Sequence, residues 1–354
     1  MLGSELLSGV VLTTFSSVKM PGSILGPIAK ILGQIYNMLF NGLYGVMNVG
    51  VLGFAIIIFT LIVKIILFPL MVKQQKSSIK MQMLQPELEK IRNKYKGQKD
   101  QLSQQKMAME MQDFQKKNGI NLMGGCLPLL VQLPILYALF YIFQNAYVYV
   151  DVIGQNYTDI ANAILQIPQT TRMEVFGPYA QTFVDQYKNV ATIKANGFDL
   201  SRLNDIVMLV NYLNVDSWQS IVSQLGSNGT ALVDLLATKN NIETFLFLPL
   251  VSQAGLKWPG IMVPILAAIT TYAQSKIMMS MTPPASNGGQ ENPAMAMTKT
   301  MTYVMPFMMG FFCISMPAGL GLYWTISNVF GIIQQVILQK YYKKKFMGEA
   351  AQNG

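Results

Sequence analysis

The chain has 354 residues, a formal net charge of +9 and no histidine. Hydrophobic residues make up 51% of it and charged residues only 12%, whereas a soluble domain carries about 25% charged residues. Without histidine, catalysis by Ser-His-Asp or Cys-His groups is excluded, as are His-ligated zinc and haem. Cys126 and Cys313 both lie in apolar runs and make neither a disulfide framework nor a thiolate metal site. We therefore expect no enzymatic activity, no cofactor, no metal, and a surface that largely faces lipid.

Residues 1–50 are predicted to be an extracytoplasmic N-terminal segment that carries one amphipathic helix over residues 24–47. Apolar residues recur there at helical spacing, with little charge between them, at Ile28, Ile31, Leu32, Ile35, Leu39 and Leu43. We expect this helix to lie along the outer membrane interface. A hydrophobic tail that packs on the other helices is the alternative.

Five apolar runs predict membrane-spanning helices, since a span needs about 20 mostly apolar residues. These spans are residues 51–72, 119–145, 258–279, 300–316 and 317–339, the last including a tight turn at its start. The connecting segments are a cytoplasmic hairpin (73–118), an enlarged extracytoplasmic segment (146–257), a cytoplasmic loop (280–299) and a basic cytoplasmic tail (340–354). The predicted fold class is an all-α polytopic membrane protein.

The distribution of basic residues predicts the orientation. Residues 73–118 carry eleven Lys/Arg against five Asp/Glu, whereas residues 146–257 carry six against nine. Four lysines follow residue 339. Because cytoplasmic loops carry the excess of Lys and Arg, we expect a multi-pass protein of the bacterial plasma membrane, with its N-terminus outside and its C-terminus in the cytoplasm.

The hairpin segment 73–118 shows two helical runs. Apolar residues recur at steps of three and four at Met81, Leu84, Leu88, Ile91 and Tyr95, and again, after Lys96-Gly97, at Leu102, Met107, Met111 and Phe114. This pattern predicts two antiparallel helices with facing apolar stripes. Their basic outer faces are either a solvated surface that sets the topology, or a dock for an anionic partner such as lipid headgroups, ribosomal RNA or a targeting receptor.

Lys64 is the charged residue deepest within a predicted span. It precedes Lys73 by nine residues, or about 13 Å along a helix. A lysine at this depth costs about 2.5–3.5 kcal/mol on insertion scales and by default marks a functional site. No acidic residue lies in any predicted span. Two classes of function fit a lone cation: a passage for acidic peptide segments, or a transporter for an anionic solute.

Four stretches resemble the YidC/Oxa1/Alb3 membrane protein insertases, in the five-span form typical of Gram-positive bacteria. They are residues 59–74 (FTLIVKIILFPLMVKQ), 81–95 (MQMLQPELEKIRNKY), 119–143 (GINLMGGCLPLLVQLPILYALFYIF) and 317–335 (PAGLGLYWTISNVFGIIQQ). The resemblance implies five helices around a hydrophilic groove. It implies an insertase and chaperone that moves apolar segments with short acidic or polar outer regions into the bilayer, without nucleotide hydrolysis. It also implies newly made membrane proteins as substrates, with the ribosome, a signal-recognition targeting receptor and the Sec translocon as further partners.

Carried over by position, the resemblance implies that Lys64 is the groove cation, and that Thr60 and Trp324 line the groove. Gln274 is a weaker choice on the third span. The polar residues Tyr323, Gln132 and Gln334 complete the predicted substrate groove. Two departures stand out: the family usually has arginine where this chain has Lys64, and segment 146–257 is longer than usual. That segment is either a small outer domain or an elaborated loop.

Overall fold

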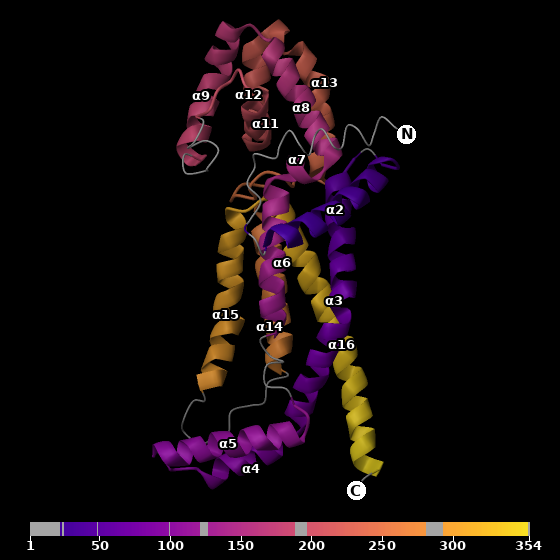
Figure 1. The fold of residues 1–354 in the computed structure, drawn as a ribbon, viewed down its shortest axis with the longest axis vertical. Helices are drawn as coiled ribbons and strands as arrows, with labels where there is room; N and C mark the ends of the chain where they lie inside the picture. The colour runs from indigo at the N-terminus through magenta and orange to yellow at the C-terminus, as the bar shows by residue number, and fades with distance from the viewer. Residues whose placement is uncertain are drawn as a thin grey trace. The chain divides into compact units, whose positions relative to one another are not determined.

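The computed structural model describes residues 22, 25–47, 49–98, 100–120, 127–187, 197–280 and 293–352. Over these ranges the chain is almost entirely α-helical (Figure 1), with one pairing of two short strands. The prediction of an all-α class is confirmed at this level. The chain forms two compact units. The first comprises Met1–Phe59, Pro134–Val263 and Cys313–Tyr323; the second comprises Thr60–Leu133, Pro264–Phe312 and Trp324–Gly354.

Two helices in the described ranges are long and apolar enough to cross a membrane, at Val51–Met83 and Ala318–Gly348. They belong to α3 (Val51–Met83) and α16 (Ala318–Gln352). Three further apolar helices are α6 (Leu127–Gln144), α14 (Met262–Ser280) and α15 (Pro293–Ile314). Each coincides with one of the predicted spans, and the number of spans stays a prediction.

Several helix ends differ from the predicted boundaries. Helix α3 continues to Met83 although its span was predicted to end at residue 72, and α16 continues through the predicted tail to Gln352. Helix α15 begins at Pro293, inside the predicted loop 280–299, and α14 begins at Met262. The residues that follow the predicted ends of the spans in α3 and α16 include many Lys, Gln and Met, which are good helix formers. The sequence therefore becomes more polar at these two boundaries although the helix continues. Residues 121–126 and 281–292 lie outside the described residues.

In the second unit, α4 (Gln85–Lys94) and α5 (Gln101–Lys117) occupy the segment for which a hairpin was predicted. They lie side by side in Figure 1. Lys94 and Tyr95 both contact the Glu110 carboxylate across the pair, at 2.9 and 2.8 Å. The Asp100 side chain caps α5 by accepting from the Ser103 amide at 2.9 Å. The cytoplasmic location of this pair stays a prediction.

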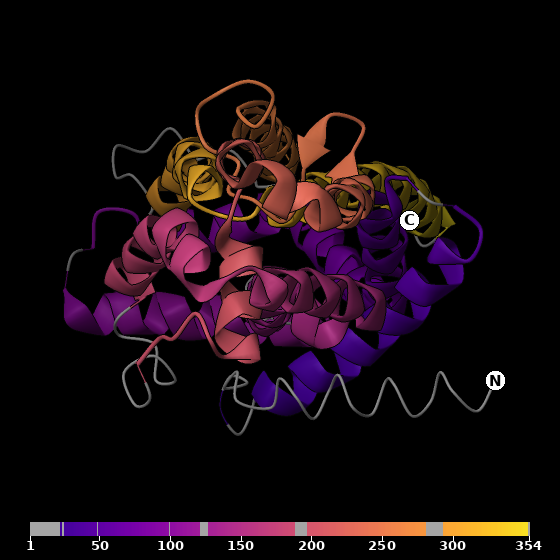
Figure 2. The ribbon, with the colours of Figure 1, turned by 90° about the horizontal axis from the view of Figure 1, so that it is seen from above.

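Segment 146–257 is mostly helical in its described residues and belongs to the first unit. It contains α7 (Ala146–Tyr149), α8 (Asp151–Gln166), α9 (Gln169–Tyr187), α11 (Leu203–Tyr212), α12 (Val215–Leu225), the 3₁₀ turn η2 (Gly226–Gly229) and α13 (Thr230–Glu243). Figure 2 looks down on these helices. Ile153, Tyr157, Ile160 and Ile164 place a fully buried stripe along α8 at steps of three and four residues. The choice between a small outer domain and an elaborated loop stays a prediction.

Helix α2 (Leu25–Tyr44) is present where an amphipathic helix was predicted, and its position along the membrane interface stays a prediction. The buried side consists of Ala29, Gly33, Tyr36 and Phe40, whereas Ile31 is 58% exposed. The packing is close at Gly33, because a Cβ there would overlap the ring of Tyr149. Ala29 and Gly33 are small, and Gly33 lets α2 approach Tyr149 closely. Small residues of this kind do not stand out when side chains are ranked by hydrophobicity.

A short antiparallel hairpin precedes α14 in the first unit. Its strands are β1 (Thr244–Phe245) and β2 (Leu248–Pro249). The Phe245 ring packs where Gly53 leaves α3 without a side chain. It also meets Phe54 edge to face, with the ring centroids 5.1 Å apart. The hairpin is therefore held on the first turn of α3.

A buried ion pair closes the end of α13. The Lys239 ammonium lies 2.6 Å from Oε2 of Glu243, and both side chains are 8% exposed. Tyr157 of α8 donates to the other carboxylate oxygen at 2.6 Å. Burial, together with the Glu243 charge, holds the pKa of Tyr157 well above its usual value. The phenol therefore stays protonated and remains a donor to the carboxylate.

We predict that Lys239→Met lowers the free energy of unfolding by about 3–5 kcal/mol, because it leaves the Glu243 carboxylate buried without its cation. The double variant Lys239→Met/Glu243→Gln should recover most of this loss. Urea titration of the detergent-solubilised chain, followed by the fluorescence of Trp218, measures both. Lys94→Met is the control, since it breaks the exposed Lys94–Glu110 pair and should leave the transition unchanged. Equal stability of Lys239→Met and wild type would contradict the assignment.

Candidate functional site

Polar side chains of α14 and α16 form one hydrogen-bonded cluster in the second unit. The indole Nε1 of Trp324 donates to Oγ1 of Thr271 at 2.8 Å. The amide oxygen of Asn328 lies 3.1 Å from Oγ1 of Thr270, and the amide nitrogen donates to Oε1 of Gln274 at 2.8 Å. This orientation of the amide suits the donors and acceptors around it. We call these five residues the α14–α16 cluster.

The cluster links two apolar helices through polar contacts alone. Inside a bilayer no water is available, so polar side chains must satisfy one another. Thr271 is 6% exposed and Asn328 is 5% exposed, whereas Trp324 and Gln274 are half-buried. The half-buried members leave a polar edge on the surface of the helix pair.

Lys64 lies on α3 in the same unit and is half-buried. Within the described ranges it makes no hydrogen bond or ion pair. Thr60, one turn before it, is completely buried. The cation predicted from the sequence is thus present without a counter-charge from the described part of the chain.

A contact between α3 and α16 sets Lys64 and Trp324 at a similar level. The Gln75 side chain donates to the backbone oxygen of Gln335 at 3.0 Å. Lys64 precedes Gln75 by 11 residues, and Trp324 precedes Gln335 by 11 residues. Both lie about 16 Å from the contact at 1.5 Å per residue, on helices that run in the same direction in Figure 1. The cation and the α14–α16 cluster therefore occur at comparable depth.

The remaining predicted groove residues lie outside the cluster. Tyr323 is 1% exposed and belongs to the first unit, whereas Gln132 of α6 and Gln334 of α16 are half-buried. Of the seven predicted groove residues, the cluster includes Trp324 and Gln274.

Three members of the cluster were absent from the predicted groove, namely Thr270, Thr271 and Asn328. A sequence signal for two of them exists, because Thr270 precedes Gln274 by four residues and Asn328 follows Trp324 by four. Residues four apart lie on one face of a helix. Equal spacing of polar residues on two apolar helices was therefore a readable sign of facing surfaces.

Apolar helices with a polar cluster between them, and with a lysine inside an apolar run, are typical of a helical membrane protein. Residues 43–345 match the sequence profile of the family described as 60Kd inner membrane protein. The chain belongs to this family, and the predicted YidC/Oxa1 relationship is confirmed.

Among its relatives are several bacterial insertases. Membrane protein insertase YidC 2 of Bacillus anthracis is 30% identical over 287 residues, which are 81% of this chain and 71% of that protein. Membrane protein insertase YidC of Clostridium perfringens is 29% identical over 338 residues, 93% of this chain and 97% of that protein. Membrane protein insertase MisCA of Bacillus subtilis is 27% identical over 287 residues, 81% and 70% of the two chains.

We predict that the Trp324–Thr271 hydrogen bond contributes measurably to the packing of α14 on α16. In a double-mutant cycle of Trp324→Phe and Thr271→Val, the coupling energy should be about 0.6–1.7 kcal/mol, the average and maximum for hydrogen bonds between membrane helices. Unfolding of the reconstituted protein by a denaturing detergent measures it. Trp324→Phe combined with Ser327→Ala, a neighbour on α16 outside the cluster, is the control and should show additive effects. A coupling energy near zero would contradict the bond.

Proposed function

We propose that the protein is a membrane protein insertase and chaperone. It takes apolar segments with short acidic or polar outer regions from the cytoplasm into the bilayer through a hydrophilic groove. The observation that carries this proposal is Lys64, a cation without a partner in the described ranges, at the level of the α14–α16 cluster. The names of the relatives support it, since each is a membrane protein insertase.

In the proposed mechanism Lys64 attracts the acidic outer part of a substrate. An ammonium without a counter-charge in a poorly screened setting attracts carboxylates more strongly than one in water. Lysine suits this task as a compact point charge. The half-buried members of the α14–α16 cluster, Trp324 and Gln274, offer hydrogen bonds to the polar backbone as it passes. Gln132 and Gln334, which are also half-buried, extend the same polar lining.

Burial supplies the free energy in this scheme, so no nucleotide has to be hydrolysed. Removing apolar surface from water is worth about 25 cal/mol per Å². A negative charge that crosses the membrane outward gains about 2.3 kcal/mol per 100 mV of membrane potential. Both contributions favour a short acidic tail followed by an apolar helix.

The proposal includes five spans, with the N-terminus outside and the C-terminus in the cytoplasm of a bacterial cell. The apolar helices α3, α6, α14, α15 and α16 support the five spans. The basic residues of α4 and α5, and those after residue 339, support the orientation. The segment from α7 to α13 then lies on the extracytoplasmic side of the membrane.

We predict that Lys64→Ala lowers insertion of a single-span substrate with an acidic outer tail by about tenfold, equivalent to about 1.4 kcal/mol. Lys64→Arg keeps the charge and should retain insertion. Insertion is measured in cells depleted of their own insertase and supplied with each variant. Lys73→Ala is the matched control, because it removes an exposed charge from the same helix.

The outcomes separate the role of Lys64 from the function as a whole. If wild type does not insert the substrate, the insertase function is wrong. If Lys64→Ala inserts as well as wild type, only the role of the cation is wrong. Saturable uptake of an anionic solute by vesicles that contain only this protein would favour a transporter instead.

We further propose that α4 and α5 dock the ribosome, with the targeting receptor and Sec translocon as related partners. Replacement of exposed Lys90, Lys96, Lys106 and Lys116 by glutamine should weaken co-sedimentation with ribosomes and flatten its dependence on salt. Replacement of the same four by arginine keeps the charge and should preserve binding. Association that does not change with salt would contradict an electrostatic dock.

A further inference from the structure

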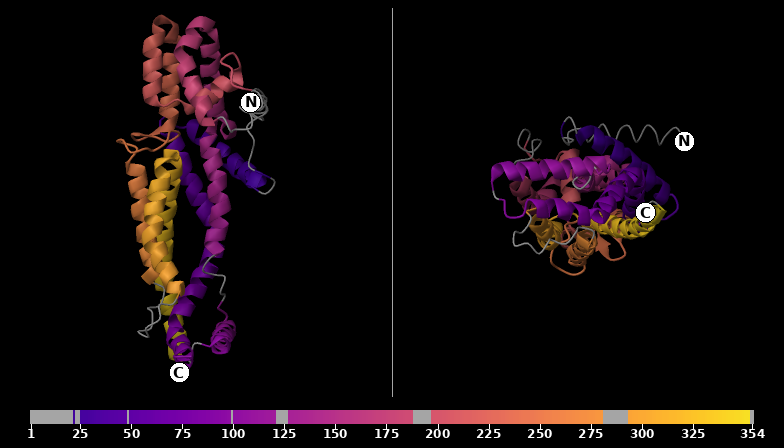
Figure 3. Two further views of the ribbon diagram at one scale, coloured as in Figure 1. Left: turned by 90° about the vertical axis from the view of Figure 1, so that its left-hand side faces the viewer. Right: turned by 90° about the horizontal axis from the view of Figure 1, so that it is seen from below.

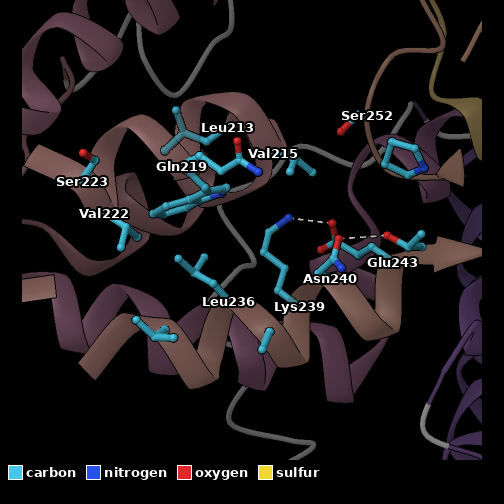
Figure 4. Close-up of a pocket in the computed structure, with 15 residues that line it drawn as sticks. Leu213, Val215, Gln219, Val222, Ser223, Leu236, Lys239, Asn240, Glu243 and Ser252 are labelled. Atoms are coloured by element: carbon cyan, nitrogen blue, oxygen red, sulfur yellow. Dashed lines mark hydrogen bonds and ion pairs between the residues drawn. The ribbon is translucent and has the colours of Figure 1, made fainter. Parts of the chain in front are cut away.

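The first unit contains a cavity of about 530 Å³ between α12, α13 and the β1–β2 hairpin (Figure 4). This size falls within the range of about 300–1,000 Å³ that small-molecule sites occupy. Apolar side chains from both helices form most of its wall, including Val215, Val222, Val233 and Leu236, and Leu213 from the connection before α12 adds to it. Thr244, Pro249 and Ser252 line the end next to the hairpin. None of the functional residues discussed above lies here.

Two side chains in the lining, Lys239 and Trp218, carry N–H groups that no acceptor in the described ranges takes up. Both oxygens of Glu243 already accept, one from Lys239 and one from Tyr157. The Lys239 ammonium carries three N–H bonds, yet Glu243 is its sole oxygen partner in the described ranges. Trp218 also lines the cavity; it is 6% exposed, and its Nε1 has no hydrogen-bond partner in the part of the chain that the structure describes. A ligand that fits this site has an apolar body and a hydrogen-bond acceptor.

The hairpin that closes one end of the cavity exposes large apolar side chains. Leu246 is 77% exposed and Phe247 is 49% exposed, at the tip between β1 and β2. Trp258, 73% exposed, stacks on Phe247 with a centroid distance of 5.9 Å. Trp258 precedes the apolar helix α14 by four residues, and Phe247 stacks on this tryptophan. Aromatic residues at the end of an apolar helix are typical of the membrane interface, so the tip faces lipid.

The lipid-facing tip lies within reach of the cavity. Thr244 and Pro249 line the cavity and stand only two residues from Leu246 and Phe247, or about 7 Å of extended chain. Lys239 is one turn from the same end of α13. Val233 lies six residues further along the helix, about 9 Å deeper. Donors are thus placed near the lipid end, and apolar walls continue beyond them.

We propose that this cavity binds an acyl chain of a membrane lipid. The chain lies between α12 and α13 along Val222, Val233 and Leu236. The ester carbonyl oxygen of the lipid accepts a hydrogen bond from the ammonium of Lys239. A neutral carbonyl suits the site, because Lys239 and Glu243 already balance each other in charge.

A quenching experiment tests the proposal in the full chain. Trp258→Phe and Trp324→Phe leave Trp218 as the sole tryptophan of three. We expect vesicles of phosphatidylcholine brominated on the acyl chains to quench its fluorescence, relative to unbrominated vesicles. Ala237→Phe, on the cavity wall, should abolish this quenching by filling the space. Ala231→Phe is the matched control, since Ala231 is exposed on α13 outside the lining, and quenching should persist.

Three outcomes would overturn the proposal: no quenching by brominated phosphatidylcholine, quenching only by an added brominated fatty acid, or equal quenching in Ala237→Phe and Ala231→Phe. Val233→Phe fills a different part of the cavity and repeats the test if Ala237→Phe fails to fold. Insertion activity does not enter this measurement, so its result is independent of the proposed function.

Discussion

The hydrogen bonds between α14 and α16 determine which faces of these two helices meet in the second unit. An apolar helix surrounded by lipid gains nothing by turning a polar side chain outward, because no water is there to meet it. Trp324 and Asn328 therefore face Thr270, Thr271 and Gln274. Once these partners meet, the rotation of each helix about its axis is determined. The remaining faces are left to lipid, and Phe307 and Phe311 of α15 show the same apolar exposure, at 81% and 75%. Figure 3 shows the three helices together.

Lys239 and Lys64 both carry a charge that is at least partly buried, and burying a charge costs free energy. Lys239 is buried, but the Glu243 carboxylate compensates its charge at 2.6 Å, and Tyr157 donates to the other oxygen of that carboxylate. Lys64 is half-buried on an apolar helix, and nothing in the described ranges compensates it. The ion pair with Glu243 accounts for the buried charge of the first lysine. An uncompensated cation lowers stability, so its persistence favours a task that involves a passing negative charge.

The sequence predicted the apolar helices well because each is a continuous local pattern. Composition and length were enough for α3 and α16, and Lys64 stood out as a charge in an apolar run. The side of α2 that packs against the protein could not be predicted, because the close approach at Gly33 depends on Tyr149, far away in the chain. The packing of segment 146–257 was beyond reach for the same reason. Asn37 and Asp151, for example, exchange two hydrogen bonds across 114 residues.

The residues of the candidate site fall into the same two groups, namely those that a local sequence pattern indicates and those that depend on tertiary packing. Lys64, Trp324 and Gln274 could be chosen from residue type and depth. The participation of Thr270, Thr271 and Asn328 requires knowing which face of α14 meets which face of α16. Such a pairing is a tertiary property, although the spacing of four residues on each helix already restricts it. The cavity at Lys239 gave no sequence signal at all, because its lining combines residues of two helices and a hairpin.

The unbroken course of α3 has a mechanical consequence. At 1.5 Å per residue its 33 residues extend about 50 Å, well beyond a hydrocarbon layer of about 30 Å. Lys64 and Met83, the last residue of α3, therefore lie on one continuous helix that contains Pro69, about 28 Å apart. A tilt of about 10° swings the far end by about 5 Å relative to Lys64. A binding partner that displaces α4 would then change the orientation of Lys64, and no helix would have to unwind.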